Sequence, residues 1–137
     1  MATIKGANSA SGYEITASCD FNASDNDHMT NTPASNGNQR IWTFSAWVKV
    51  DASAADRCIF HIGTWPAEPW TLISVHDTDK ILFRSYYDGN DYLYLSNTTF
   101  DEDGTWNHLV IAVDTTQGTD TNRVKMYKNG TELTSFQ

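Results

Sequence analysis

The sequence predicts an all-β protein built as an antiparallel β-sandwich, and three observations lead to this prediction. Helical periodicity is nearly absent, whereas alternation between apolar and polar residues is frequent. Short runs that are rich in β-branched and aromatic residues recur at regular spacing along the chain. Polar turn residues separate these runs, as expected for strands that fold back on one another.

The clearest strand is predicted for Ile41–Val50, whose sequence is IWTFSAWVKV. Its alternate residues form one apolar face, composed of Trp42, Phe44, Ala46, Val48 and Val50. The other face carries Thr43, Ser45, Trp47 and Lys49. One buried face and one partly hydrated face are typical of a strand in an antiparallel sheet.

Further strands are predicted downstream. In chain order they are Arg57–Gly63, Trp70–Asp77, Lys80–Asp88, Asp91–Asn97 and Asn107–Asp114. The segment Gly63–Trp70 carries two prolines and is predicted to be a loop. Tight turns are expected at Asp77-Thr78-Asp79 and at Asp88-Gly89-Asn90.

The last part of the sequence predicts a hairpin. Arg123–Leu133 reads RVKMYKNGTEL, which gives a strand, an Asn129-Gly130 turn and the start of a partner strand. Asn-Gly between alternating segments is a strong hairpin signal, because both residues of such a turn must accept a positive φ angle.

The chain has 137 residues and a formal net charge of −8, with only 9 lysines and arginines. This length predicts one domain with a sizeable hydrophobic core. We expect no nucleic-acid partner and no docking on anionic lipid, because both need clustered basic residues. No apolar run approaches the roughly 18 residues of a membrane span, so no membrane insertion is expected.

Residues 1–12 are small and polar, and we expect them to form an N-terminal arm, either flexible or docked on a partner. Residues 13–137 are expected to form the sandwich. Met1–Ser11 lacks the apolar stretch of a signal peptide, so synthesis in a cytoplasm without export by that route is expected if Met1 is the native start. Cys19 and Cys58 are therefore expected to be buried free thiols, with a single disulfide between them as the alternative.

Several stretches carry a resemblance to a known family. The segments TWNHLVIAVDTT and NRVKMYKNGTEL are similar to laminin-G-like or concanavalin A-like jelly-roll domains, in which a Trp-x-His segment opens a central strand and an Asn-Gly hairpin follows. The matching residues are Trp106, His108, Val124, Tyr127, Asn129 and Gly130. Residues 42–50 resemble an earlier strand of these domains, and residues 12–35 resemble their opening strand and loop. The resemblance implies a concanavalin A-like jelly roll.

The chain looks most like the copies of this domain found in virion structural and tail-fibre proteins of bacteriophages. That resemblance implies a location in the virion, as a fibre, spike or capsid decoration protein. Its partners would be other virion proteins and further copies of itself. Such domains usually continue past the Asn-Gly hairpin with more strands. The chain is therefore expected to be either part of a longer sequence or a domain that a neighbouring subunit completes.

The residues do not indicate an enzyme. Jelly-roll glucanases place paired carboxylates in a Glu-x-Asp-x-Glu pattern. None of the glutamates of this chain lies in such a pattern. They are Glu14, Glu68, Glu102 and Glu132. Neither cysteine has a catalytic context, and no nucleophile elbow is present. His61 and His108 lie within predicted strands and are interpreted as structural histidines.

Three Asp-x-Asp pairs make calcium binding a hypothesis, because hard oxygen ligands suit Ca²⁺. The pairs are Asp25 with Asp27, Asp77 with Asp79, and Asp101 with Asp103. None of them completes the EF-hand pattern. Solvated turn aspartates are the alternative interpretation, and no other cofactor is predicted.

The aromatic residues divide into a predicted core and a candidate ligand surface. Trp42, Phe44 and Trp106 are expected to fill the core. The candidate surface lies in two stretches and consists of Trp65, Trp70, Tyr86, Tyr87, Asp88 and Asn90. Exposed indole rings can stack on the apolar faces of sugars while polar neighbours bind the hydroxyl groups. A subunit interface and simple loop packing are the alternatives, since interfaces are also enriched in Trp and Tyr.

Together these observations favour a non-catalytic virion structural protein whose lectin-like domain binds host-surface polysaccharide. Repetition on a particle would strengthen weak sugar binding through avidity. Two alternatives stay open at this point. One is a structural cement subunit without a ligand, and the other is a carbohydrate-binding module of a bacterial exported protein.

Overall fold

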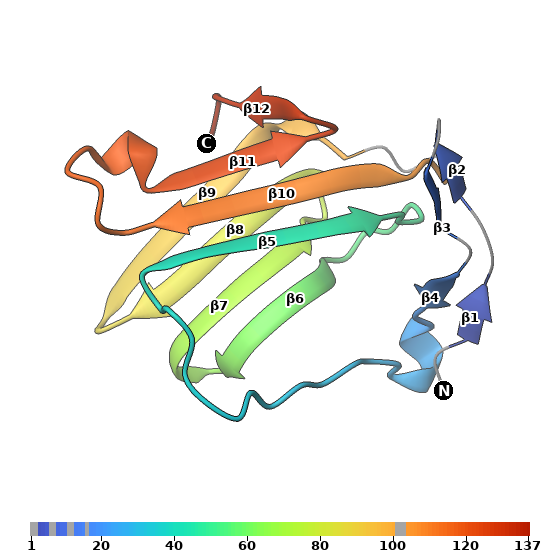
Figure 1. The fold of residues 1–137 in the computed structure, drawn as a ribbon, viewed down its shortest axis with the longest axis horizontal. Helices are drawn as coiled ribbons and strands as arrows, with labels where there is room; N and C mark the ends of the chain where they lie inside the picture. The colour runs from blue at the N-terminus through green and yellow to red at the C-terminus, as the bar shows by residue number, and fades with distance from the viewer. Residues whose placement is uncertain (1–2, 6–7, 11–12, 16, 101–103) are drawn as a thin grey trace. The chain divides into compact units, whose positions relative to one another are not determined.

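A computed structural model describes residues 3–5, 8–10, 13–15, 17–100 and 104–137 (Figure 1). The chain divides into two compact units, one comprising Met1–Gly37 and the other Asn38–Gln137. In the part of the chain that the structure describes, no helix is long and apolar enough to cross a membrane. The predicted boundary between an arm and a sandwich at residue 12 stays a prediction.

The first unit contains short strands and one turn of 3₁₀ helix. Its elements are β1 (Thr3–Lys5), β2 (Asn8–Ala10), β3 (Tyr13–Ile15), β4 (Ser18–Asp20) and η1 (Ala23–Asp25). Strand β1 pairs antiparallel with β4, and β2 pairs antiparallel with β3.

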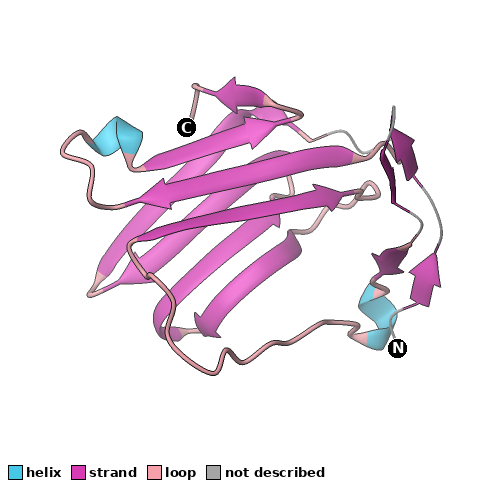
Figure 2. Cartoon of the chain, in the orientation of Figure 1, coloured by secondary structure: helices cyan, strands magenta, loops and turns pink. Residues whose placement is uncertain are grey.

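The second unit consists of two four-stranded antiparallel sheets, and it confirms the predicted fold class (Figure 2). The first sheet has the order β12-β11-β10-β5. Its strands are β5 (Ile41–Val48), β10 (Asn107–Asp114), β11 (Val124–Lys128) and β12 (Thr131–Leu133), and the 3₁₀ helix η2 (Asp120–Asn122) precedes β11. The second sheet has the order β6-β7-β8-β9. Its strands are β6 (Arg57–Thr64), β7 (Ala67–Val75), β8 (Lys80–Tyr87) and β9 (Asn90–Thr99).

The hydrophobic core lies between these two sheets. Every second residue of β10 is buried in this core. The apolar residues of β7 and β8 that face β10 from the second sheet are buried as well. The core residues are Ile73, Val75, Ile81, Phe83, Phe100, Leu109, Ile111, Val113, Val124, Met126 and Leu133. Apolar residues alternate with polar ones in the sequence because alternate side chains of each strand point into the core.

Strand β5 confirms the alternation predicted for this segment, although it ends at Val48 instead of Val50. The predicted apolar residues are partly buried and the residues between them are exposed. Trp42 contacts Phe83 with 6.1 Å between ring centroids, and Phe44 contacts Phe60 at 5.2 Å. These ring pairs connect the first sheet to the second.

The predicted turns at Asp77–Asp79 and at Asn129-Gly130 are confirmed. The amide of Asp79 donates to the carbonyl of His76 at 2.8 Å. Asn129 and Gly130 have φ angles of 50° and 81° and join β11 to β12. Both angles are positive, as a two-residue hairpin turn of this kind requires.

The predicted loop at Gly63–Trp70 is wrong, because this segment forms the β6–β7 hairpin. The turn lies at Trp65–Pro66, and Trp70 pairs with Gly63 in the sheet. A register shift follows Gly63, so Pro69 lies at an irregularity in the ladder where a missing N–H is tolerated. A Cβ atom on Gly63 would clash with the carbonyl oxygen of Pro69, so only glycine fits there.

Two predictions about burial are also wrong. Trp106 is half-buried and lies outside the core, because it precedes β10 and does not belong to the alternating row of that strand. Cys19 and Cys58 are free, as predicted, but both are exposed. Cys58 lies on β6, an edge strand of its sheet. Desolvation by neighbouring atoms nevertheless raises the pKa of its thiol.

The C-terminal residues cross from the first sheet to the second (Figure 1). The residues after β12 make two main-chain hydrogen bonds with β9. The amide of Asn97 donates to the carbonyl of Ser135 at 2.9 Å, and the amide of Gln137 donates to the carbonyl of Leu95 at 2.8 Å. The ring of Phe136 packs edge-on against Tyr94 at 5.9 Å. This segment therefore pairs with β9 and closes one side of the core.

Replacing Ile111, which is fully buried, with alanine should lower the free energy of unfolding by about 2–5 kcal/mol. The same substitution at Ile62, which is 51% exposed, should change it by less than about 1 kcal/mol. Urea unfolding followed by tryptophan fluorescence measures both changes. Equal effects at the two positions would contradict the assignment of the core.

Candidate functional site

Two hairpin turns lie at the same end of the second sheet. One is the β6–β7 turn at Trp65–Pro66, and the other is the β8–β9 turn at Asp88–Gly89. The carboxylate of Glu68 accepts a hydrogen bond from the amide of Gly89 at 2.9 Å. This contact joins the two turns, so the two stretches singled out in the sequence lie side by side.

Three aromatic rings, which we call the aromatic platform, lie beside these turns: Trp65, Trp70 and Tyr86. Trp70 and Tyr86 are direct partners across β7 and β8, and their rings stack with centroids 5.8 Å apart and an angle of 11°. Trp65 meets Trp70 edge-on at 4.6 Å. Trp70 is 4% exposed, whereas Trp65 is 60% exposed. The buried central ring therefore holds the exposed indole in a fixed position.

An ion pair lies next to the aromatic platform. Arg84 donates from Nε to Oδ1 of Asp91 at 2.9 Å and from its terminal NH2 to Oδ2 at 2.6 Å. The guanidinium carbon of Arg84 also lies 5.5 Å from the ring centre of Trp70, within cation–π distance. The hydrogen bond to Asp91 raises the pKa of Arg84, and the same bond lowers the pKa of Asp91. Both groups therefore stay charged at neutral pH.

The predicted ligand residues divide between two faces of the sheet. Trp65, Trp70 and Tyr86 form the aromatic platform, but Trp70 is buried and is not the exposed ring that was predicted. Adjacent strand residues point to opposite faces, so Tyr87, which is 62% exposed, points away from Tyr86. Asp88 and Asn90 lie at the turn, where the side-chain amide of Asn90 donates to the carbonyl of Asp88 at 2.8 Å.

Three residues that hold this surface together were not predicted from the sequence: Glu68, Arg84 and Asp91. Arg84 and Asp91 are brought together by the β8–β9 register, which opposes Arg84 to Leu93 and Tyr86 to Asp91. The two charged residues are thus diagonal neighbours on one face. The signal in the sequence was the opposite charge of Arg84 and Asp91, which lie on either side of the predicted turn at Asp88-Gly89-Asn90.

The aspartate pairs proposed for calcium differ in their contacts. Asp25 and Asp27 both accept hydrogen bonds from Asn22. The carboxylate of Asp77 lies 2.7 Å from Nδ1 of His76, whereas Asp79 accepts a bond from Arg57 at 3.0 Å. Asp101 and Asp103 lie outside the described residues.

In the part of the chain that the structure describes, one group of residues has a metal-ligating composition. The ligand atoms of Asp56, His76 and Asp77 lie within 4.8 Å of one another. One imidazole with two carboxylates is a mixed donor set, which differs from the all-oxygen set that Ca²⁺ prefers. Calcium binding therefore stays a prediction.

A shallow depression of about 510 Å³ lies on the first sheet and is lined by Trp47, Trp106, His108, Asn129 and Gly130. The rings of Trp47 and His108 stack at 5.1 Å. Nε2 of His108 lies 3.0 Å from the hydroxyl of Ser45. These contacts agree with the interpretation of His108 as a structural histidine.

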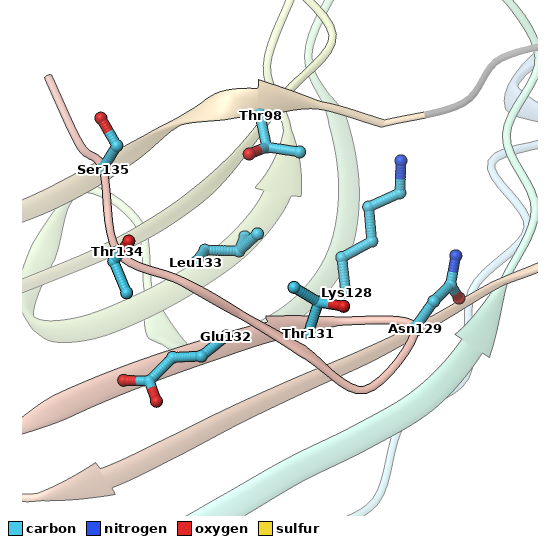
Figure 3. Close-up of a pocket in the computed structure, with 8 residues that line it drawn as sticks. All are labelled: Thr98, Lys128, Asn129, Thr131, Glu132, Leu133, Thr134 and Ser135. Atoms are coloured by element: carbon cyan, nitrogen blue, oxygen red, sulfur yellow. The ribbon is translucent and has the colours of Figure 1, made fainter.

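A second depression of about 390 Å³ lies between β9 and the β11–β12 hairpin (Figure 3). Its lining residues are Thr98, Lys128, Asn129, Thr131, Glu132, Leu133, Thr134 and Ser135. Two of its charged groups have partners that are part of the fold. Lys128 donates to the carbonyl of Thr99 at 2.9 Å, and Glu132 accepts from Lys125 at 2.8 Å. We assign these groups to the packing of the hairpin.

Two antiparallel four-stranded sheets packed around one core define the second unit as a β-sandwich. The family model described as the concanavalin A-like lectin/glucanases superfamily, a laminin G type of model, matches residues 23–137. The chain therefore belongs to the concanavalin A-like lectin/glucanase superfamily. No curated protein and no solved structure matches it.

Replacing Asp91 with asparagine should lower the free energy of unfolding at neutral pH by up to about 1 kcal/mol, since the pair with Arg84 is partly exposed. Arg84 lowers the folded-state pKa of Asp91. The stabilisation is therefore complete above the ordinary aspartate pKa of about 3.9 and is lost as the pH falls through the lowered folded-state value. Urea unfolding at several pH values tests this prediction. The free energies of unfolding of wild type and Asp91→Asn should differ at neutral pH and become equal in acid.

The matched control is Asp88→Asn in the neighbouring turn. Among the described residues, the carboxylate of Asp88 contacts no guanidinium group. Any difference in the free energy of unfolding between this variant and wild type should be the same at neutral and at acidic pH. A pH-independent loss of stability in Asp91→Asn would mean that the ion pair is not its cause.

Proposed function

We propose that this chain is a non-catalytic, glycan-binding domain of a bacteriophage virion structural protein. The domain would bind host-surface polysaccharide through the aromatic platform of Trp65, Trp70 and Tyr86. The observation that carries the proposal is the exposed indole of Trp65, which rests on the buried ring of Trp70 and so has a fixed orientation.

The chemistry of this surface supports a sugar ligand. A sugar ring has an apolar C–H face, which an exposed indole can cover, and hydroxyl groups at its rim, which need polar partners. Arg84, Asp91 and the turn residues Asp88 and Asn90 place charged and amide groups around the aromatic platform. Because Arg84 and Asp91 already bind each other, they are held in position before a ligand arrives, which limits the entropic cost of binding.

The absence of catalysis is part of the proposal. Hydrolysis of a glycosidic bond needs a pair of carboxylates across the scissile bond. Beside the aromatic platform, Glu68 binds the amide of Gly89 and Asp91 binds Arg84. Both carboxylates therefore hold the fold of the site, which fits a binding surface better than an acid–base pair.

The virion location rests on the sequence resemblance to phage fibre and decoration proteins. Membership of a superfamily that includes lectins is compatible with such a role. Many copies on one particle would convert weak binding by each domain into strong attachment.

Replacing Trp65 with alanine should weaken polysaccharide binding at least about tenfold, a loss of about 1.4 kcal/mol, because it removes the stacking surface. Isothermal titration against polysaccharides purified from the host surface measures the effect. Trp47→Ala is the control, because Trp47 is also an exposed tryptophan but lies on the other sheet. Equal affinities of Trp65→Ala and wild type would refute the site. A wild-type domain that binds none of the polysaccharides would favour a purely structural subunit.

The virion location has its own test, which is peptide mass spectrometry of density-purified particles. We expect peptides of this chain in the particle fraction. Their presence only in the cell envelope or the medium would contradict the phage assignment. That outcome would favour a module of a bacterial exported protein.

A further inference from the structure

The loop that precedes β6 and the turn that follows β7 lie side by side at one end of the second sheet. Arg57 opposes Val75 in the antiparallel pairing of β6 with β7. The same register, continued by one residue on each strand, brings Asp56 opposite His76. The amide of Asp77 donates to Oδ1 of Asp56 at 2.8 Å, which joins the loop to the turn. Three side chains with metal-ligating groups therefore meet at this end of the sheet.

We call these three residues the His–Asp group: Asp56, His76 and Asp77. One ligand atom from each residue lies within 4.8 Å of the ligand atoms of the other two. The ligand atoms around one tetrahedral zinc ion lie about 3.3 Å apart, since each is about 2.0–2.1 Å from the metal. Small rotations of the side chains would therefore bring the His–Asp group to the spacing of a coordination sphere.

The two carboxylates of the His–Asp group have no basic side chain as a partner in the described part of the chain. Neither Asp56 nor Asp77 forms an ion pair with a lysine or an arginine there. Arg57, which follows Asp56 directly, donates to Oδ1 of Asp79 at 3.0 Å. Like charges that are held close together repel each other, and a bound cation would remove this repulsion.

The surroundings of the imidazole also favour a cation. Nδ1 of His76 lies 2.7 Å from Oδ1 of Asp77, and it accepts a hydrogen bond from the amide of Thr78 at 3.3 Å. A neutral ring presents either a hydrogen or a lone pair at Nδ1. A lone pair satisfies the amide of Thr78 but faces the carboxylate of Asp77 with no hydrogen between them. A metal ion bound by both atoms would resolve this conflict.

The loop and the turn are held together independently of any metal. The guanidinium group of Arg57 donates to the carbonyls of Asp51 and Ser53 in the loop, at 3.2 Å and 3.1 Å. It also donates to the carbonyl of His76 in the turn at 3.3 Å. The ligand residues are thus brought together before an ion arrives, which limits the entropic cost of binding.

We propose that the His–Asp group binds one Zn²⁺ ion, with water as the remaining ligand. Imidazole nitrogen and carboxylate oxygen are both ligands of Zn²⁺ in proteins. Ca²⁺ takes six to eight oxygen ligands, which one imidazole and two carboxylates do not supply. The bound ion would connect the β5–β6 loop to the β7–β8 turn. It would stabilise the domain, because the two segments come together only in the folded chain.

Isothermal titration of the 137-residue chain with zinc chloride tests this proposal. We expect one Zn²⁺ ion to bind per chain and to raise the midpoint of thermal unfolding. Asp56→Asn is a conservative variant, because the amide oxygen of asparagine can still accept the hydrogen bond from Asp77. Asp56→Asn and His76→Gln should each weaken Zn²⁺ binding at least about tenfold, since each removes a direct ligand.

Two control variants match these substitutions outside the His–Asp group. Asp51→Asn removes the same charge from the same loop, and its main chain can still bind Arg57. His61→Gln removes a histidine of β6 that does not belong to the group. Both controls should bind Zn²⁺ like wild type. Urea unfolding of each variant without metal separates a loss of folding from a loss of binding.

X-ray absorption at the zinc edge identifies the ligands directly. We expect nitrogen and oxygen neighbours at about 2.0–2.1 Å and no sulfur at about 2.3 Å. A sulfur neighbour would overturn the proposal, because it would place the ion at Cys19 or Cys58. Absence of one-to-one binding at about 100 micromolar Zn²⁺ would also overturn it. So would an unchanged affinity in both Asp56→Asn and His76→Gln, or displacement of Zn²⁺ by an equal concentration of Ca²⁺.

This inference does not rest on glycan binding. The aromatic platform lies beside the β6–β7 and β8–β9 turns, whereas the His–Asp group lies at the β7–β8 turn, at the opposite end of the strands. Trp65→Ala should therefore leave the affinity for Zn²⁺ unchanged, and Asp56→Asn should leave the affinity for polysaccharide unchanged. Failure of one proposal does not imply failure of the other.

Discussion

The apolar contact between the two sheets is the interaction on which the rest of the second unit depends. Leu109 and Ile111 of β10 are fully buried, as are Ile73 and Val75 of β7. Burying such side chains contributes about 1.5–3 kcal/mol each. Because strand residues alternate between faces, this contact fixes the side on which every other residue of these strands lies. A shift of register by one residue would expose the whole row.

The candidate site is a consequence of that constraint. With Ile73 and Phe83 facing the core, Trp70 and Tyr86 point to the opposite face of the second sheet, where their rings stack. Arg84 lies in the same row as Tyr86, and it lies against Trp70 and binds Asp91. The outer face of a sheet thus acquires a rigid arrangement of aromatic and charged groups. Rigidity of this kind is what a surface needs in order to bind a ligand without a large loss of entropy.

The same packing buries the aromatic rings of β5 only in part. The C-terminal segment closes the core beside β9, but the rings of Trp42 and Phe44 stay half-exposed along β5.

The sequence by itself determined the fold class, the faces of β5 and the Asn129-Gly130 turn. Period-two alternation and positive φ angles are local properties, so they can be read from neighbouring residues. Only the tertiary structure decided that Trp70 is buried, that Gly63–Trp70 is a hairpin, and that Arg84 binds Asp91. These features depend on the register between strands and on what lies across the sheet. Residues far apart in the chain determine both, and local sequence therefore does not specify them.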